Sequence, residues 1–164
     1  MKVALLQQLL KMTFTSEKLY YQAADQVQVI KFSRFLNHQS TLRNKLCNRL
    51  IEKLTSNNIE PEKRHIDKLT VDVSGLEIKR RLENKDYVKQ VKKCLNFDNE
   101  IIDKCKELLE VEDLPIDILE ILSMEMGELL VNIIRGEKII ESYQKEQRIE
   151  SHRQKTKIIR LSSN

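Results

Sequence analysis

The sequence has few of the residues that form turns. Its 164 residues include only 3 glycines, 2 prolines and no tryptophan. A β-sandwich or barrel needs many turns and a nucleotide-binding loop needs several glycines, so both are poor fits. No window approaches the ~20 apolar residues that a bilayer-spanning helix requires. These absences favour a single soluble, all-α domain that does not enter a membrane.

Paired cysteines are also missing. The three cysteines, Cys47, Cys94 and Cys105, are odd in number and include no Cys-x-x-Cys pair. They stand where apolar residues recur, so we expect buried, reduced thiols rather than a redox or metal site. The amino terminus has only a short apolar run before Gln7 and no small-residue cleavage pattern, which predicts no secretion signal. We therefore expect a cytoplasmic protein.

The net charge of +4 is confined to the end of the chain. From Lys138 onward there are seven Lys or Arg and three Glu, a difference of +4, so the basic and acidic residues of 1–137 cancel. A neutral body argues against a nucleic-acid-binding domain. We therefore expect two regions, a helical domain over residues 1–145 and a basic tail over 146–164 that is frayed or disordered.

Apolar residues recur at spacings of three and four in four segments, as in amphipathic helices. The segments cover residues 2–24, 29–55, 87–109 and about 115–143. The link between the first two is short, which predicts antiparallel neighbours.

The start and interior of the last segment carry specific signals. Asp113 can accept hydrogen bonds from unpaired backbone amides and Pro115 suits a first helical turn, so we expect the helix to start there. Gly127 and Gly136 each cost roughly 1 kcal/mol relative to alanine in a helix interior. We expect them to mark a close helix contact, a kink or a helix end.

A long connection separates the second and third segments, over residues 57–84. A helix of ~24 residues is ~36 Å long, and a connection of this size can return the chain along it. We therefore expect a bundle with one long crossover, which includes a short helix near 76–82. A Glu-x-x-His sequence, Glu62 to His65, falls here beside two cations, and we interpret it as a solvated helical turn.

Polar side chains interrupt each of the four apolar stripes near its middle. If the helices pack at similar heights, these interruptions meet in one layer. A buried carboxylate is costly unless it is paired, hydrogen-bonded or bound to a metal, so such a layer would need explaining. The interrupting residues are Ser16 and Glu17, His38 and Gln39, Asp98 and Glu100, and Glu125 and Glu128.

Together these patterns are similar to a known family. The two long amphipathic pairs, the crossover, the Tyr20-Tyr21-Gln22-Ala23-Ala24 patch and the Asp113-Leu114-Pro115 start of the last helix resemble a bacterial ferritin-like family known only as a domain of unknown function. The resemblance covers roughly residues 3–140. It implies a ferritin-like four-helix bundle with one long crossover, without indicating a substrate.

The chain departs from the metal-binding members of the wider ferritin-like superfamily. Those members use a Glu from each of two helices and Glu-x-x-His from each of the other two. In the second helix, Phe35 lies three residues before His38, where the motif requires Glu. In the fourth helix, the residue three positions after Glu125 is Glu128, where the motif requires His. We therefore expect a degenerate site with no metal and no cofactor. If a metal were bound, its ligands would come from a small set: Glu17, His38, Asp98, Glu100, Glu125 and Glu128.

These observations favour a protein that is not an enzyme and that acts through association with itself, as a homo-oligomer, or with a protein partner. The apolar run over 116–140 exceeds what a monomer core requires. An alternative is a residual metal-binding or oxidative-stress role for the ligand set above. A weaker alternative is binding of an anion, a nucleic acid or a lipid, by residues 145–160.

Overall fold

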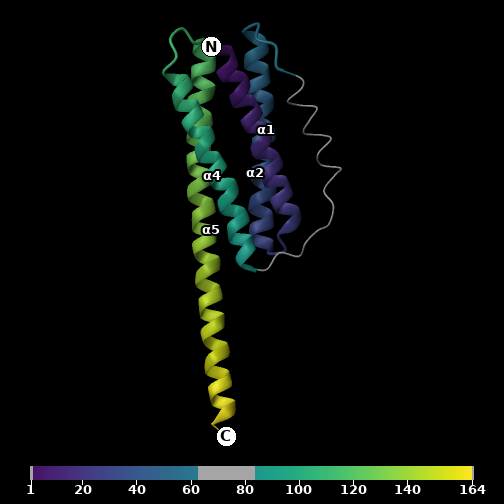
Figure 1. Ribbon diagram of the computed structural model, residues 1–164, viewed down its shortest axis with the longest axis vertical. Helices are drawn as coiled ribbons and strands as arrows, with labels where there is room; N and C mark the ends of the chain where they lie inside the picture. Colours follow the sequence, from purple (N-terminus) through teal and green to yellow (C-terminus); the bar gives the residue numbers. More distant parts are fainter. Residues whose placement is uncertain (1, 63–83, 164) are drawn as a thin grey trace.

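The computed structural model describes residues 2–62 and 84–163. In these residues the chain forms four α-helices and no strand, which confirms the all-α prediction (Figure 1). The helices are α1 (Lys2–Gln26), α2 (Ile30–Ser56), α4 (Asn84–Leu109) and α5 (Ile116–Ser162). No helix in the described part of the chain has a stretch both long and apolar enough to cross a membrane.

The four helices form a bundle in which each has two close neighbours. Both α1 and α5 pack against α2 and α4, so α1 lies diagonally opposite α5, and α2 diagonally opposite α4. Helices α1 and α2 are antiparallel, as are α4 and α5 (Figure 1). Helices α2 and α4 run in the same direction, so the end of α2 and the start of α4 lie at opposite ends of the bundle (Figure 1). Residues 63–83 of the predicted crossover lie outside the described part of the chain. The short helix expected near 76–82 lies outside the described residues, as does His65.

The apolar stripes predicted from the sequence form the core. Burying a Leu, Ile, Val or Phe side chain contributes roughly 1.5–3 kcal/mol, so the many such residues here are the main source of stability. The fully buried aliphatic residues of the core include Leu6, Leu9, Leu10, Leu36, Leu46, Leu50, Leu54, Val91, Ile101, Leu108, Ile118, Leu122 and Leu129.

The two glycines of α5 have different surroundings. A Cβ at Gly136 would lie 2.7 and 2.9 Å from the Leu95 methyl carbons and 3.0 Å from Cζ of Phe35. Glycine there permits α5 to approach α4 and α2 closely, as expected. A Cβ at Gly127 would meet nothing within 4 Å, and the helix continues through it. A close contact and a helix end at Gly127 are therefore both contradicted.

The start of α5 differs from the predicted one. Asp113 does not cap the helix: it adopts a left-handed conformation with φ of 60°, and its carbonyl accepts a hydrogen bond of 3.0 Å from Lys2 Nζ. The N-cap is Pro115, which makes no side-chain cap hydrogen bond. A proline disfavours the helical conformation in the residue before it, so Leu114 cannot belong to the helix.

The basic tail is helical rather than frayed. Helix α5 continues to Ser162, and its final part projects beyond the ends of the other helices (Figure 1). The last buried residue is Tyr143, and residues 144–163 are exposed. This segment contains no glycine or proline and is rich in Gln, Lys, Glu and Arg, which have high helix propensity. The expected disorder over 146–164 is therefore contradicted up to Ser162.

Candidate functional site

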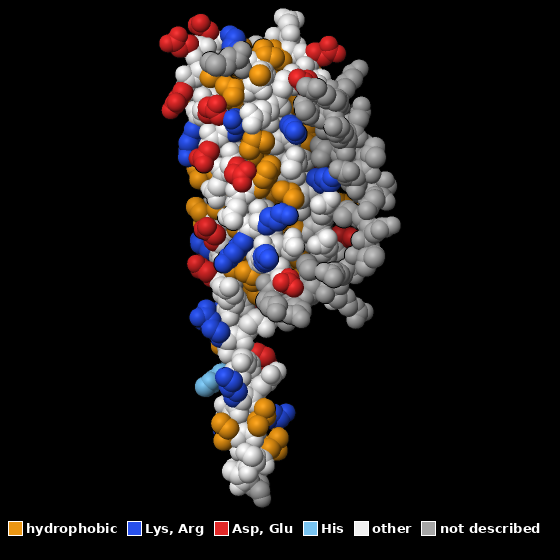
Figure 2. Space-filling view, viewed as in Figure 1, with side chains coloured by type: hydrophobic (Ala, Val, Ile, Leu, Met, Phe, Trp, Pro, Cys, Tyr) orange, Lys and Arg blue, Asp and Glu red, His pale blue; other side chains and the backbone are white. Residues whose placement is uncertain are grey.

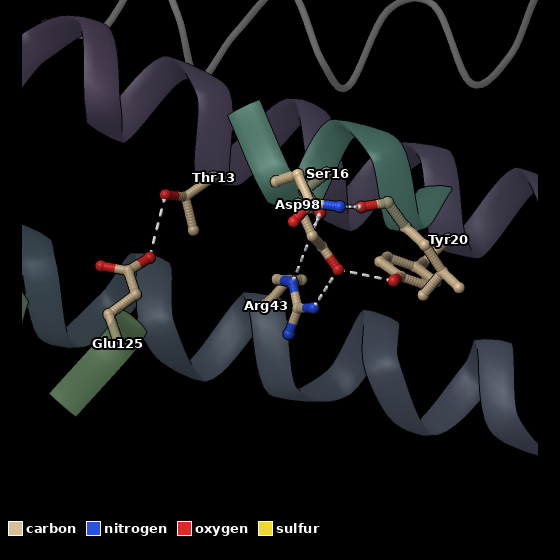
Figure 3. Close-up of polar contacts among 8 residues, drawn as sticks. Thr13, Ser16, Tyr20, Arg43, Asp98 and Glu125 are labelled. Atoms are coloured by element: carbon tan, nitrogen blue, oxygen red, sulfur yellow. Dashed lines mark hydrogen bonds and ion pairs between the residues drawn. The ribbon is translucent and has the colours of Figure 1, made fainter. Parts of the chain in front are cut away.

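The most polar part of the core is a cluster centred on Asp98 of α4. Asp98 is fully buried and accepts four hydrogen bonds (Figure 3). Ser16 Oγ donates to Oδ1 at 2.9 Å and Tyr20 Oη to Oδ2 at 2.6 Å. Arg43 donates from Nε to Oδ1 at 3.2 Å and from Nη2 to Oδ2 at 2.5 Å. The Arg43–Asp98 pair is thus a bidentate salt bridge without solvent exposure.

Three helices supply this cluster. Ser16 and Tyr20 are four residues apart on α1, so they share a face. Arg43 comes from α2, and its ion pair with Asp98 joins the two diagonally opposed helices α2 and α4 through the bundle centre. The Arg43 guanidinium carbon also lies 5.2 Å from the centroid of the Tyr20 ring, within cation–π range. Arg43 is not among the site residues predicted from the sequence. Its position, four residues after Gln39 and four before Cys47, nevertheless places it on the buried stripe.

The cluster fixes the charge of its members. Burial alone would lower the pKa of Arg43, but the charge of Asp98 and the hydrogen bonds to it, together with the charges of Tyr20 and Glu125, raise it. Burial, and next the charge of Asp98, raise the pKa of the Tyr20 hydroxyl. Tyr20 therefore stays protonated and donates to the carboxylate, while Arg43 stays charged. Among the described residues, Arg43 Nη1 has no hydrogen-bond partner.

A second buried carboxylate, Glu125 of α5, is in a much poorer environment. Thr13 of α1 shares its hydroxyl proton between the Leu9 carbonyl, at 3.0 Å, and Oε1 of Glu125, at 3.3 Å across the other diagonal of the bundle (Figure 3). Among the described residues, Oε2 of Glu125 has no hydrogen-bond partner. Burial raises the pKa of Glu125 to about 7, although the Thr13 hydrogen bond and the charges of Arg43 and Arg49 act in the opposite direction. At neutral pH a large fraction of Glu125 is therefore protonated.

The cysteines lie in the core as predicted. Cys47, Cys94 and Cys105 are free and buried. Burial raises the pKa of all three thiols, and the charge of Glu125 adds to this effect at Cys47 and Cys105. Because the thiolate is the reactive form, these groups are poor nucleophiles and poor metal ligands.

The structure does not bring the six candidate ligand residues together. Asp98 and Glu125 are buried, but they belong to the two separate contacts described above. Glu17 is half-buried and accepts from Asn44 at 3.0 Å, and half-buried Glu128 forms an ion pair of 3.1 Å with Arg49. His38 and Glu100 are exposed.

The residues at mid-bundle do not fit a metal ion. A cation site needs several unprotonated donors aimed at one point. Here the oxygens of Asp98 are occupied by Ser16, Tyr20 and Arg43, and the guanidinium adds a fixed positive charge that repels a cation. Across residues 2–62 and 84–163, no group of three or more His, Cys, Asp or Glu is placed to hold a metal.

Comparisons of the chain with protein-family models, with curated proteins and with solved structures found no match.

Proposed function

We propose that the protein is a ferritin-like helical bundle that performs no catalysis and acts by associating with itself or with a protein partner through α5. The observation that carries this proposal is the amount of α5 that is left exposed. In the bundle its outward side bears exposed apolar residues, and all residues of 144–163 are exposed.

The core supports a structural role for the buried polar groups. Both buried carboxylates face inward, and the groups around them are other buried side chains. A buried ion pair contributes little net stability but is strongly destabilising when one partner is lost, so such a pair favours one arrangement of helices over others. The Arg43–Asp98 salt bridge would then set the register of α2 against α4, where metal-binding relatives of the superfamily place ligands.

The projecting end of α5 supports association. Helices in proteins gain most of their stability from the packing of an apolar face against other parts of the structure. The segment 144–162 has no such face in the bundle, yet it carries exposed Ile149, Ile158, Ile159 and Leu161 (Figure 2). A binding partner would supply the missing contacts.

Sedimentation velocity of the full chain over a wide range of concentration tests the proposal. The expected result is a mass above one chain that increases with concentration, or a stoichiometric complex with one identified partner. A chain that is monomeric at every concentration and binds no partner in stoichiometric amount would overturn it.

One observation favours a second candidate function, binding of a nucleic acid or an anionic lipid surface. The projecting segment presents exposed cations against only two acidic residues, Glu146 and Glu150. Lys31 of α2 further neutralises Glu146 through an ion pair of 2.8 Å. The cations are Lys145, Arg148, Arg153, Lys155, Lys157 and Arg160.

Binding to labelled duplex DNA and to vesicles containing anionic lipid tests this second candidate. Contacts with phosphates weaken steeply with salt. Binding that falls with salt and disappears when the six cations are replaced by Gln would support it. The matched control replaces six exposed cations of the bundle by Gln: Lys11, Arg34, Lys45, Lys89, Lys92 and Lys93. Equal losses in both variants would contradict a specific role of the projecting segment.

A further inference from the structure

The outward side of α5 carries a regular seam of exposed residues. Six exposed positions recur at alternating spacings of four and three, the repeat of a coiled-coil seam. The core is formed by the opposite side of the same helix, which includes Leu122, Leu129 and Ile140. We call the six residues the outer seam: Glu120, Met124, Gly127, Val131, Ile134 and Lys138.

The middle of the outer seam is apolar and has room for another side chain. Met124, Val131 and Ile134 are 43%, 49% and 51% exposed, and Leu130 beside them is 47% exposed. At Gly127 a Cβ would meet nothing within 4 Å. A glycine inside a helix costs stability, and here the bundle gains no close contact from it. A helix packed on the seam would gain that contact, because the missing side chain leaves space for one of its own.

We propose that the outer seam pairs with the outer seam of a second copy of this chain, with the two helices antiparallel. This inference rests on the proposed function, since it names the occupant of one surface of α5. A two-fold axis near residue 129 places Glu120 opposite Lys138 of the second copy, Met124 opposite its Ile134, and Gly127 opposite its Val131. The three pairs then join opposite charges, two apolar residues, and a glycine with a larger side chain. Each pair occurs twice in the dimer.

The charges at the two ends of the seam select this orientation. In a parallel pair Glu120 would face Glu120 and Lys138 would face Lys138, and like charges repel. In the antiparallel pair both contacts join opposite charges. Neither Glu120 nor Lys138 has an ion-pair partner in the part of the chain that the structure describes. The seam spans fewer than three heptads, so the dimer is of the weak, concentration-dependent kind.

Charge reversal in the full chain tests the orientation. Glu120→Lys and Lys138→Glu each turn both attractive contacts into repulsive ones, and we expect each to weaken dimerisation by about 3- to 10-fold in sedimentation equilibrium. The double variant restores both contacts and should dimerise as the wild type does. A parallel pair would show no weakening in either single variant, which would overturn the proposed orientation.

Disulfide trapping tests the register. Cysteine in place of Met124 on one chain and in place of Ile134 on another should form a disulfide-linked dimer when the two are mixed under mild oxidation. The native cysteines are buried and do not interfere. Either variant alone should cross-link poorly. Efficient cross-linking of each variant with itself, and no disulfide between the two different variants in the mixture, would indicate the parallel arrangement and overturn the proposal.

A matched pair of substitutions tests whether the seam is the interface. Val131→Asp buries a charge in the dimer and should weaken it by about 30-fold or more. Val3→Asp on α1 makes the same change at a similarly exposed residue, 44% against 49%, and should leave the dimer intact. Self-association that survives Val131→Asp would overturn the seam while leaving the proposed function standing. A wild-type chain that is always monomeric would overturn the seam, and the proposed function falls with it only if no partner binds.

Discussion

Asp98 and Glu125 are both carboxylates in the same core, but they are held in opposite ways. Asp98 accepts four hydrogen bonds from three side chains, including two from Nε and Nη2 of the Arg43 guanidinium. Glu125 accepts one long hydrogen bond from Thr13, and its Oε2 has no partner among the described residues. The comparison shows that two carboxylates with similar burial can differ widely in the number and charge of the donors around them.

Removal of Arg43 should produce the largest effect. In Arg43→Ala the Asp98 charge stays buried without its cation, and we expect the free energy of unfolding to fall by about 3–5 kcal/mol. Urea unfolding followed by circular dichroism measures it. Arg34→Ala, an exposed arginine on the same helix, is the control. A loss below about 1 kcal/mol would mean that the ion pair is not the element that distinguishes the two carboxylates.

Glu125→Gln should change how stability depends on pH. The folded-state pKa of Glu125 is about 7 and its ordinary value is 4.5, so the native state binds more protons between these values. Stability from this group is therefore complete below about pH 4.5 and is lost as pH rises through 7. The variant should match the wild type at low pH and exceed it above pH 7 by at most about 3 kcal/mol. Urea unfolding across this pH range measures the difference in stability between the variant and the wild type. A difference that does not change with pH would contradict the raised pKa of Glu125.

Tyr20→Phe should have an intermediate effect. It removes one donor to the ionised Asp98 while keeping the ring, and hydrogen bonds to charged groups are worth about 1.5–3 kcal/mol. Thermal and urea unfolding measure the loss. The neighbouring Tyr21, which is 53% exposed, provides the control Tyr21→Phe. An equal effect in both variants would show that the Tyr20 hydroxyl has no special role.

Thr13→Val should have the smallest effect. It removes the single donor to Glu125, which is partly neutral at pH 7, so we expect a loss of about 0.5–1.5 kcal/mol. The same change should raise the pKa of Glu125 further, because the Thr13 hydrogen bond lowers it. Titration of a labelled Glu125 carboxyl by NMR detects this. The control is Thr15→Val, because the Thr15 hydroxyl donates to the Lys11 carbonyl instead. This variant should leave the pKa of Glu125 unchanged. A pKa that stays constant in Thr13→Val would contradict the hydrogen bond.

Much of the fold could be predicted from the sequence, because it follows from periodicity. Helices α1, α2 and α4 begin and end within a few residues of the predicted limits, and α5 begins within one residue of its predicted start but ends at Ser162, well beyond the predicted end. The prediction of disorder over 146–164 is wrong because it takes charge and polarity as signs of disorder. These residues have high helix propensity and continue a helix that the bundle has already nucleated.

The site was predicted only in part, for a physical reason. Adjacent residues on a helix differ by about 100° in direction, so the rotation of each helix decides which polar residue is buried. Near the middle of α1 the polar residues Thr13 and Ser16 are buried, while Glu17 is only half-buried. On α2 the buried cation is Arg43, and arginine is seldom buried unless it is paired. Its partner lies 55 positions away in sequence, so no local pattern connects them.

The unbroken length of α5 has a consequence for reach. At 1.5 Å per residue, the 33 positions from residue 129 to Ser162 correspond to about 50 Å of stiff rod. In the antiparallel pair the two rods point away from each other, so their basic tips would stand about 100 Å apart. Such a dimer could bind two distant anionic sites at the same time. Binding of one tip would then raise the effective concentration of the other tip at the second site.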